Sequence, residues 1–217
     1  MFHRLLALLF PPRCVLCKAF LAKEETDFCH NCRIEAPEFE KSNLKFSFLA
    51  GWTAVWYYEG NVRSSIIRYK FHGRRHYASA YGRALAMKLQ TKSLDDFDIL
   101  TWVPVAPLRR LKRGYDQVEL LAKAVGAELS VSPTKTLRKI RNTPPQSRIR
   151  DAAHRRANVL GAYRAYRPEA IRGKRILLLD DIITTGATAS ECARVLLTAG
   201  AKEVCCAAIA VTNHNSK

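Results

Sequence analysis

A buried run that ends in two adjacent acids and a small-residue turn constrains the fold of this chain more than any other feature. The run is ILLLDDIITTGAT, residues 176–188. Its apolar residues are typical of a buried strand, and Asp180 and Asp181 follow at the carboxyl end, where open α/β sheets bind ligands. Adjacent carboxylates repel each other unless something binds them, and the vicinal hydroxyls of a ribose, sometimes with a divalent cation, do so. We therefore expect a parallel α/β sheet with a sugar-binding site at this strand.

A turn of small residues follows the two acids and opens a helical pattern. Free N–H groups, hydroxyls and the dipole at a helix amino terminus suit a phosphate group, and Gly186 lets the backbone approach closely. The alternative is a Thr-capped helix beside two surface acids, but the position after a buried strand favours a ligand site. The sequence thus predicts a phosphate cradle formed by Thr184, Thr185, Gly186, Ala187 and Thr188.

Two cysteine pairs near the amino terminus have the spacing of a metal site. Cys14-x-x-Cys17 and Cys29-x-x-Cys32 are eleven residues apart, so each pair can bind one side of a tetrahedral Zn²⁺. The alternative is two disulfides, which a reducing compartment disfavours, and the first ten residues lack the cleavage site of a secretory signal. We expect a cytoplasmic protein with a closed, structural zinc knuckle.

Strand and helix signals alternate through the rest of the chain, as in a parallel sheet with crossover helices. A β-branched and aromatic run at 54–58 opens this part, so we expect a zinc-binding domain at 1–48 and an α/β domain at 49–217. Asn61 and Asp116 are expected to cap helices, and the basic stretch between Pro107 and Tyr115 is expected to be a loop. The Pro-containing segment 138–156 has no apolar period, so we expect it to lie outside the core.

The chain carries a large excess of positive charge. Its 36 Lys and Arg against 19 Asp and Glu give a formal net charge of +17, which attracts polyanions such as nucleic acid. A solvated surface or a set of pyrophosphate ligands would use the same residues. No run approaches the ~18 to 20 apolar residues of a membrane-spanning helix, so we expect no membrane insertion. The predicted phosphate track comprises Arg109, Arg110, Lys112, Arg113, Arg138, Lys139, Arg141, Arg148, Arg150, Arg155 and Arg156, and Tyr69, Phe71 and Tyr77 are candidates either for stacking single-stranded bases or for core burial.

The acid pair and the cradle together resemble a known signature. LLLDDIITTGAT is similar to the motif with which type I phosphoribosyltransferases bind 5-phosphoribosyl 1-pyrophosphate (PRPP). Other segments narrow the resemblance to the ComF-like competence proteins, and it spans nearly the whole chain. These segments are the cysteine pairs, Tyr69-Lys70-Phe71, RGYDQVELLA at 113–122, Pro145-Gln146-Ser147, and Arg155-x-x-Asn158-Val159-x-Gly161-Ala162-Tyr163.

The resemblance implies a type I phosphoribosyltransferase domain, a Rossmann-like parallel-sheet fold, with a small four-cysteine appendage. It implies that Asp180 and Asp181 hold the ribose of PRPP with Mg²⁺, and that Lys70 lies in the loop facing pyrophosphate. It also implies a flexible loop over the site around Arg109 to Arg113, with Arg113 among the catalytic groups. The implied chemistry is displacement at C1 of PRPP, in which Mg²⁺ and basic groups stabilise the departing pyrophosphate.

Three functions follow from these features. The resemblance implies a DNA-uptake protein that binds single-stranded DNA and PRPP and works with a helicase partner in natural transformation. The alternative is an active phosphoribosyltransferase that moves phosphoribose to an unidentified nucleobase-like acceptor. A third class is a PRPP-sensing regulator of duplex operator DNA, which the sequence favours less because it contains no visible helix-turn-helix.

Overall fold

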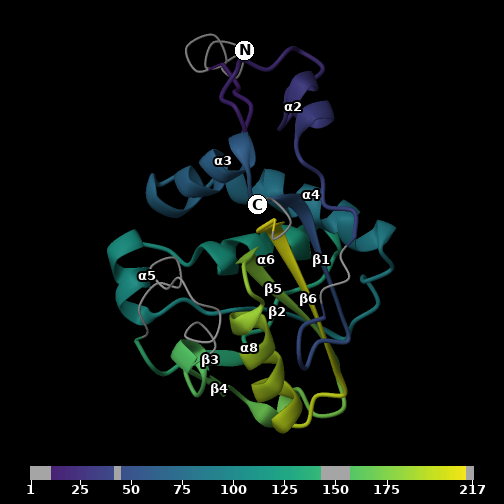
Figure 1. Ribbon diagram of the computed structural model, residues 1–217, viewed down its shortest axis with the longest axis vertical. Coiled ribbons are helices and arrows are strands. Elements are labelled where there is room, and N and C mark those ends of the chain that lie inside the picture. The colour runs from purple at the N-terminus through teal and green to yellow at the C-terminus, as the bar shows by residue number, and fades with distance from the viewer. Residues whose placement is uncertain (1–10, 42–44, 143–156, 214–217) are drawn as a thin grey trace.

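The centre of the molecule is a four-stranded parallel sheet. The computed structural model describes residues 11–41, 45–142 and 157–213. Within these residues the strand order is β1-β6-β5-β2, and every neighbouring pair is parallel. The strands are β1 (Gly51–Tyr57), β2 (Ile99–Trp102), β5 (Arg175–Ile183) and β6 (Glu203–Val211). The expected α/β class and parallel sheet are confirmed (Figure 1).

Side chains alternate across β5 and so fill two separate cores. Leu177 and Leu179 pack into the cluster under α4 (Tyr77–Thr91) and α6 (Gln117–Glu128). Ile176 and Leu178 pack on the opposite side, against α8 (Ala187–Thr198). This two-residue period is that of a strand buried on both faces. Consecutive residues of β5 therefore reach different sides of the molecule.

The segment that precedes β1 closes the edge of the sheet. The Phe39 N–H donates to the Val55 carbonyl at 2.9 Å, and the Tyr57 N–H donates to the Pro37 carbonyl at 2.7 Å. On the α8 face, Trp52 packs between two phenylalanines, with centroid distances of 5.0 Å to Phe39 and 4.9 Å to Phe46. These rings cover sheet surface that α8 leaves open.

The helices differ from the sequence prediction in two places and agree with it in a third. The basic stretch expected to be a loop is the helix α5 (Pro107–Arg113), because Pro107 fits a first helical turn and Gly114, at φ 75°, supplies the left-handed end. Asn61 caps nothing, since α3 (Gly60–Phe71) begins before it and no side chain caps that end. The prediction for Asp116 is confirmed, as its carboxylate accepts from the N–H groups of Val118 and Glu119.

A small antiparallel ladder lies where the sequence predicted an excursion. The strands β3 (Leu137–Lys139) and β4 (Tyr163–Ala165) pair, and Leu137 and Tyr163 are buried against the α8 side. Residues 138 and 139 therefore belong to the packed structure, because a ladder partner arrives from beyond residue 160. The rest of the expected excursion, from 143 to 156, lies outside the described residues.

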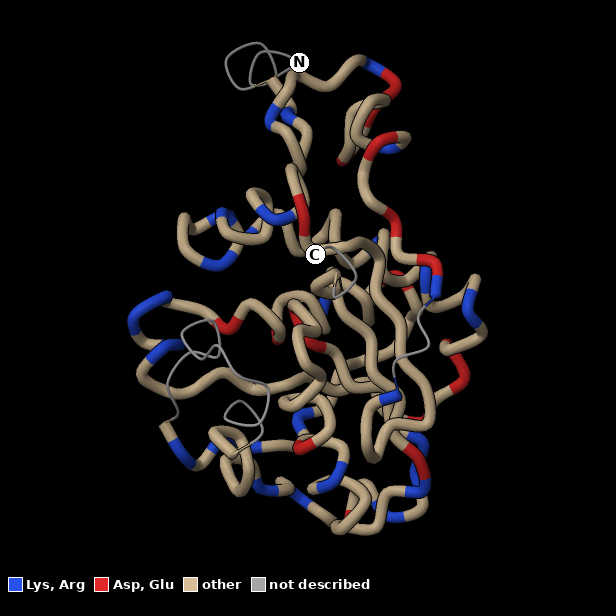
Figure 2. Tube along the Cα trace, in the orientation of Figure 1, with Lys and Arg blue, Asp and Glu red and all other residues tan. Residues whose placement is uncertain are grey.

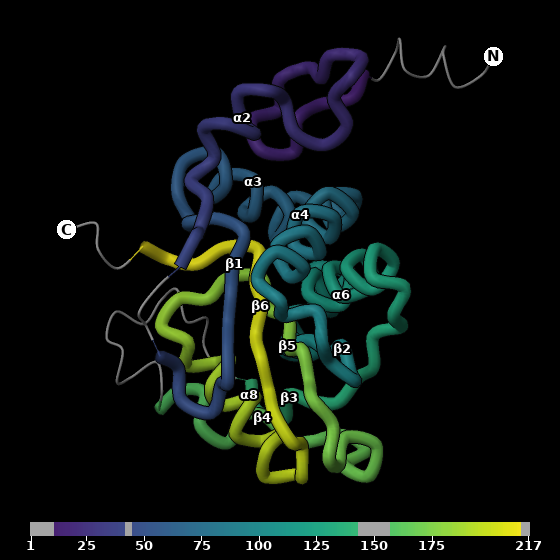
Figure 3. Tube along the Cα trace, turned by 90° about the vertical axis from the view of Figure 1, so that its right-hand side faces the viewer, coloured from purple at the N-terminus to yellow at the C-terminus, as the bar shows by residue number. Residues whose placement is uncertain are grey.

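The cysteine-rich module sits beyond the carboxyl ends of the strands. It contains α2 (His30–Glu35) and lies next to α3 and α4 in both views (Figure 1, Figure 3). Cys14, Val15 and Leu16 are buried in the same cluster as α3 and α4 side chains. The described helices include none with the length and hydropathy needed to cross a bilayer.

Candidate functional site

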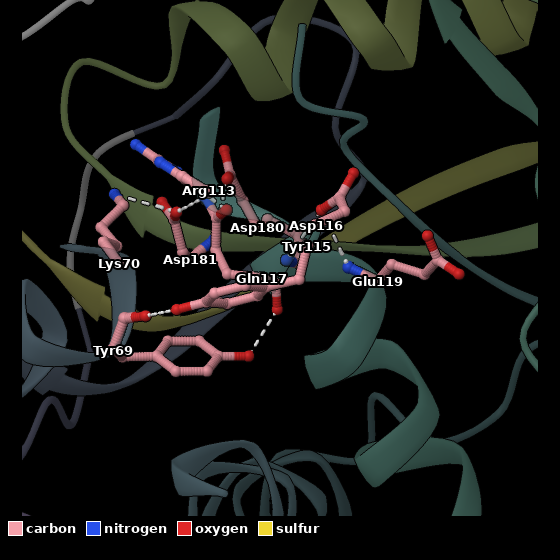
Figure 4. Close-up of polar contacts among 10 residues, drawn as sticks. Tyr69, Lys70, Arg113, Tyr115, Asp116, Gln117, Glu119, Asp180 and Asp181 are labelled. Carbon is pink, nitrogen blue, oxygen red and sulfur yellow. Dashed lines mark hydrogen bonds and ion pairs between the residues drawn. The ribbon is translucent and has the colours of Figure 1, made fainter. Parts of the chain in front are cut away.

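Asp181 is the centre of a polar cluster on the α6 side of the sheet. Its Oδ2 lies 2.9 Å from the Lys70 ammonium and accepts a 2.8 Å hydrogen bond from the Gln117 amide. Lys70 comes from the end of α3 and Gln117 from the start of α6, so one carboxylate joins three elements (Figure 4). Asp181 is 7% exposed. A carboxylate this buried is stable as a charge only because both partners stabilise it.

The surrounding residues fix the orientation of Gln117. Arg113 donates to Gln117 Oε1 at 2.8 Å, which leaves the amide nitrogen to face Asp181. The buried Tyr69 hydroxyl donates to the Gln117 carbonyl at 2.6 Å, and the Tyr115 hydroxyl in turn donates to the Tyr69 carbonyl. The predicted site residues Lys70, Arg113 and Asp181 are thus brought together through a glutamine.

Asp180 points to the other face of the sheet. The acids were expected after the strand, but β5 continues through them to Ile183, so they are separated by the strand's alternation. Asp180 Oδ1 accepts from the Asp181 N–H at 2.8 Å. Within the described residues no cation lies at ion-pair distance from Asp180. This carboxyl is buried without the compensation that Asp181 receives.

The two acids consequently have opposite proton affinities. Burial, followed by the charge of Asp181, raises the pKa of Asp180 to about 8. Burial also opposes the charge on Asp181, but the ammonium of Lys70 and the hydrogen bond from Gln117 outweigh it and lower the pKa of Asp181. Near neutral pH the pair therefore carries about one negative charge, with the shared proton on Asp180.

Residues that the sequence prediction did not place in the site lie on the Asp180 side. Lys139 donates to the Tyr163 hydroxyl at 3.1 Å, and Tyr163 is 5% exposed. Burial, followed by the nearby Arg109 guanidinium, lowers the pKa of Lys139, and Asp180 partly offsets this. No carboxylate of the described residues lies within 4.0 Å of Lys139. A half-buried, unpaired ammonium is typical of a functional site.

The amino terminus of α8 forms a pocket beside Asp180. Gly186 caps the helix with φ 70°, and an added Cβ would meet the Phe46 ring at 2.2 Å, so glycine is required for two reasons. The hydroxyl of Thr185 is buried without a hydrogen-bond partner among the described residues. The pocket is lined by Asp180, Ile182, Ile183, Thr184, Gly186, Ala187, Thr188 and Ala189.

The four cysteines of the amino-terminal module converge on one point. The sulfurs of Cys14, Cys17, Cys29 and Cys32 all lie within 4.8 Å of one another, and Cys17 Sγ is 3.6 Å from Cys29 Sγ. Zinc–sulfur bonds of about 2.3 Å in a tetrahedron require sulfur separations of about 3.8 Å. The donor set and its size therefore fit one structural Zn²⁺, and no other such group occurs within the described residues.

Comparison with known proteins agrees with both the α/β fold and the cysteine cluster. The phosphoribosyl transferase domain family matches residues 120–217, and the double zinc ribbon domain family matches residues 5–42. Competence protein F of Haemophilus influenzae is 25% identical over 182 residues, which cover 81% of this chain and 75% of that protein. The chain is thus similar to ComF-type competence proteins and carries both a zinc-ribbon and a phosphoribosyl transferase match. Lys70, Arg113 and Gln117 precede the segment matched by the transferase model.

Other relatives of the chain carry names that refer to DNA or competence. DNA utilization protein YhgH of Escherichia coli O157:H7 is 31% identical over 140 residues, covering 62% of this chain and 60% of that protein. Competence protein ComFC of Streptococcus pneumoniae is 30% identical over 153 residues, covering 70% of this chain and 64% of that protein. The likeness thus extends over somewhat less than two thirds of these two relatives.

The zinc site leads to a first prediction. Cys17→Ser removes one of four clustered thiolates, so metal analysis should find zinc falling from about one ion per chain to near zero, with loss of structure in the module. Cys205→Ser is the matched control, because Cys205 lies in β6 and outside the cluster. Zinc-free protein prepared under reducing conditions, or full zinc retention in Cys17→Ser, would contradict the site.

The raised pKa of Asp180 leads to a second prediction, for the pH dependence of stability. Between about pH 4, where an unfolded Asp ionises, and pH 8, the folded protein holds a proton that the unfolded chain has lost. The free energy of unfolding should therefore fall as the pH rises through this window. Asp180→Asn removes the effect. Between pH 5 and pH 8 the free energy of unfolding of wild type should therefore fall by about 1–3 kcal/mol relative to that of the variant.

Urea unfolding of both proteins across this range measures the difference directly. The sign of the slope of unfolding free energy against pH decides the question, because an ordinary paired carboxylate, whose pKa is lowered on folding, would give the opposite slope. Parallel curves for wild type and Asp180→Asn would show that Asp180 ionises normally.

Proposed function

We propose that this protein is a ComF-like competence protein that binds PRPP and single-stranded DNA in the cytoplasm and acts, with a helicase partner, in DNA uptake during natural transformation. The observation that carries the PRPP part is the shared pocket: Asp180 lines the same cavity as the backbone of the α8 amino terminus. A ribose hydroxyl at the acid and a 5′-phosphate at the helix terminus would occupy neighbouring parts of it. The match to the phosphoribosyl transferase domain supports the same ligand class.

Asp180 fits the magnesium ion that accompanies PRPP. Carboxylate oxygens are the ligands that Mg²⁺ prefers, and Asp180 is a carboxyl whose pKa is raised by burial and by the charge of Asp181. Asp180 is the residue that would hold the ion in the pocket, and the charge of the ion would favour ionised Asp180. The basic groups on either side, Lys70 and Lys139, would then attract the diphosphate of the ligand.

A basic face beside this site supports the DNA part of the proposal. Lys and Arg follow α5 and the end of α3 on one side of the molecule (Figure 2). Phe71 is 63% exposed there, and the Arg113 guanidinium lies 4.7 Å from its ring centroid. An exposed aromatic ring among cations is the arrangement that stacks bases and neutralises phosphates of a single strand. The names of the relatives, competence protein and DNA utilization protein, agree with a function that involves DNA.

The structure narrows the predicted DNA track. Tyr69 and Tyr77 are buried, so of the three aromatic candidates only Phe71 is available for stacking. Arg138 lies 3.9 Å from the Tyr166 ring centroid and Arg141 donates to the Leu160 carbonyl, which places both along β3 and β4 instead. The remaining candidates, Arg148, Arg150, Arg155 and Arg156, lie outside the described residues.

The alternative function, an active phosphoribosyltransferase, is favoured by Lys139. Its ammonium has no carboxylate partner among the described residues and interacts electrostatically with Asp180. Cations near a departing pyrophosphate stabilise its charge. Release of pyrophosphate from PRPP, measured over a panel of nucleobases, distinguishes a transferase from a protein that binds PRPP without consuming it.

The PRPP proposal predicts the effect of one isosteric change. Asp181→Asn keeps the shape of the side chain but removes the charge on which Lys70 and Gln117 converge, so PRPP affinity should fall by about 1–3 kcal/mol in calorimetry with Mg²⁺. Asp96→Asn is the matched control, because Asp96 is 76% exposed and pairs only with Arg175 in the described structure. Equal PRPP affinity in both variants, or no binding by wild type, would contradict the proposed site.

The DNA proposal predicts a change in salt dependence. Replacing Arg110 and Lys112 of α5 by Glu should weaken single-stranded DNA binding and flatten the plot of log affinity against log salt by roughly 0.7 per lost contact. The control is Lys202→Glu, an exposed residue that precedes β6 at the opposite end of the sheet. A salt slope unchanged in the α5 variant would exclude this face. Similar effects of both variants would indicate attraction by net charge alone.

A further inference from the structure

The turn that carries the first two thiolates is fastened to α3. The carbonyls of Val15 and Leu16, which lie between Cys14 and Cys17, point at this helix. Ser65 donates to the Val15 carbonyl at 2.6 Å, and Arg68 Nη2 donates to the carbonyls of Val15 at 3.1 Å and Leu16 at 2.5 Å. The Ser65 hydroxyl is also 2.5 Å from the hydroxyl of Tyr81, which is fully buried. The metal module and the sheet domain therefore meet at this helix through directed hydrogen bonds.

The same helix delivers the lysine of the ligand site. Tyr69 and Lys70 follow Arg68 directly, and the helix ends at Phe71. Tyr69 is held by its hydrogen bond to the Gln117 carbonyl, and Lys70 pairs with Asp181. Less than one helical turn thus separates the group that contacts the cysteine turn from the group that contacts the acid. A shift of α3 at Arg68 would move Lys70 as well.

Arg68 lacks a counter-ion of its own. Its charged group contacts only neutral carbonyls, no carboxylate of the described residues lies within 4.0 Å, and its Nε is buried without a hydrogen-bond partner. A partly buried cation needs nearby negative charge. A zinc ion of charge 2+ bound by four thiolates would give the knuckle that Arg68 contacts a net charge of 2−.

We propose that Arg68 is a positioning residue that couples the zinc knuckle to Lys70, so that zinc occupancy of the knuckle sets the affinity of the phosphoribosyl site. The loaded knuckle attracts Arg68 and holds the end of α3 against the sheet, where Lys70 meets Asp181. The empty knuckle no longer fixes the Val15 and Leu16 carbonyls, and the end of α3 is released. This inference rests on the proposed PRPP binding, and it adds regulation of that binding by the zinc knuckle, which lies outside the pocket.

The test combines Arg68→Gln with zinc removal in the full-length protein. Arg68→Gln keeps a hydrogen-bond donor but removes the charge, Arg68→Lys keeps the charge, and Arg63→Gln is the matched control at an exposed position of α3. PRPP affinity is measured by calorimetry, with zinc content and unfolding free energy determined for each sample. A chelator under reducing conditions provides the zinc-free forms.

Zinc removal should weaken PRPP binding by wild type and Arg63→Gln about tenfold, the size of one lost charged hydrogen bond. Zinc-loaded Arg68→Gln should already bind about tenfold more weakly than wild type at equal zinc content, and should respond little to zinc removal. Arg68→Lys should recover most of the affinity. Wild-type affinity in zinc-loaded Arg68→Gln, or the same response to zinc removal in every variant, would overturn the coupling.

Hydrogen exchange of the α3 amides gives a readout that does not depend on PRPP. Release of zinc should increase exchange at residues 66–71 in wild type and much less in Arg68→Gln, where the link is already broken. If wild type fails to bind PRPP, the proposed function is wrong and this measurement alone decides the coupling. Unchanged exchange of α3 after zinc release would overturn it.

Discussion

The buried ion pair between Lys70 and Asp181 is the interaction on which the rest of the site depends. Removing a carboxylate and an ammonium from water costs several kcal/mol per ion, which Coulomb attraction offsets only when the remaining hydrogen-bonding groups are satisfied. Here the Gln117 amide donates a further hydrogen bond to the Asp181 carboxylate, and Arg113 donates to the oxygen of that amide. Since these groups come from α3, α6 and β5, the pair fixes how two helices sit on the end of the sheet. An interior ion pair of this kind specifies an arrangement more than it adds stability.

Alternation along one strand gives two adjacent acids different properties. Asp181 faces the α6 side and stays ionised, whereas Asp180 faces the α8 side and retains a proton near neutral pH. A single β strand thus presents a charged acceptor on one side and a neutral carboxyl on the other. The neutral group lies in the pocket at the α8 terminus, where a second negative charge would repel a phosphate. Because Asp180 is neutral, the cavity contains no carboxylate charge that would repel an anion until a cation binds together with that anion.

The sequence predicted what depends on local pattern and missed what depends on distant contacts. The buried strand, the acid pair, the glycine turn and the cysteine spacing are all short-range signals, and the structure contains each of them. Gln117 received no role, because its significance arises only from a contact with an acid 64 residues away. Lys139 was assigned to the predicted phosphate track, with a pyrophosphate ligand or a solvated surface as alternatives, since its burial beside β4 cannot be seen in an isolated basic stretch. The interleaved aromatics show the same limit, because only packing distinguishes exposed Phe71 from buried Tyr69.

The ring of Phe46 occupies the space that a side chain at position 186 would need. Phe46 belongs to the stretch that follows the cysteine module, and it rests on Trp52, which also contacts Phe39. The Gly186 turn that lines the pocket therefore packs against a ring from the segment before β1. A gene fusion or truncation that replaced everything before β1 would leave a hollow next to Gly186. The α/β domain would therefore need a substitute for this ring if it were separated from the segment before β1.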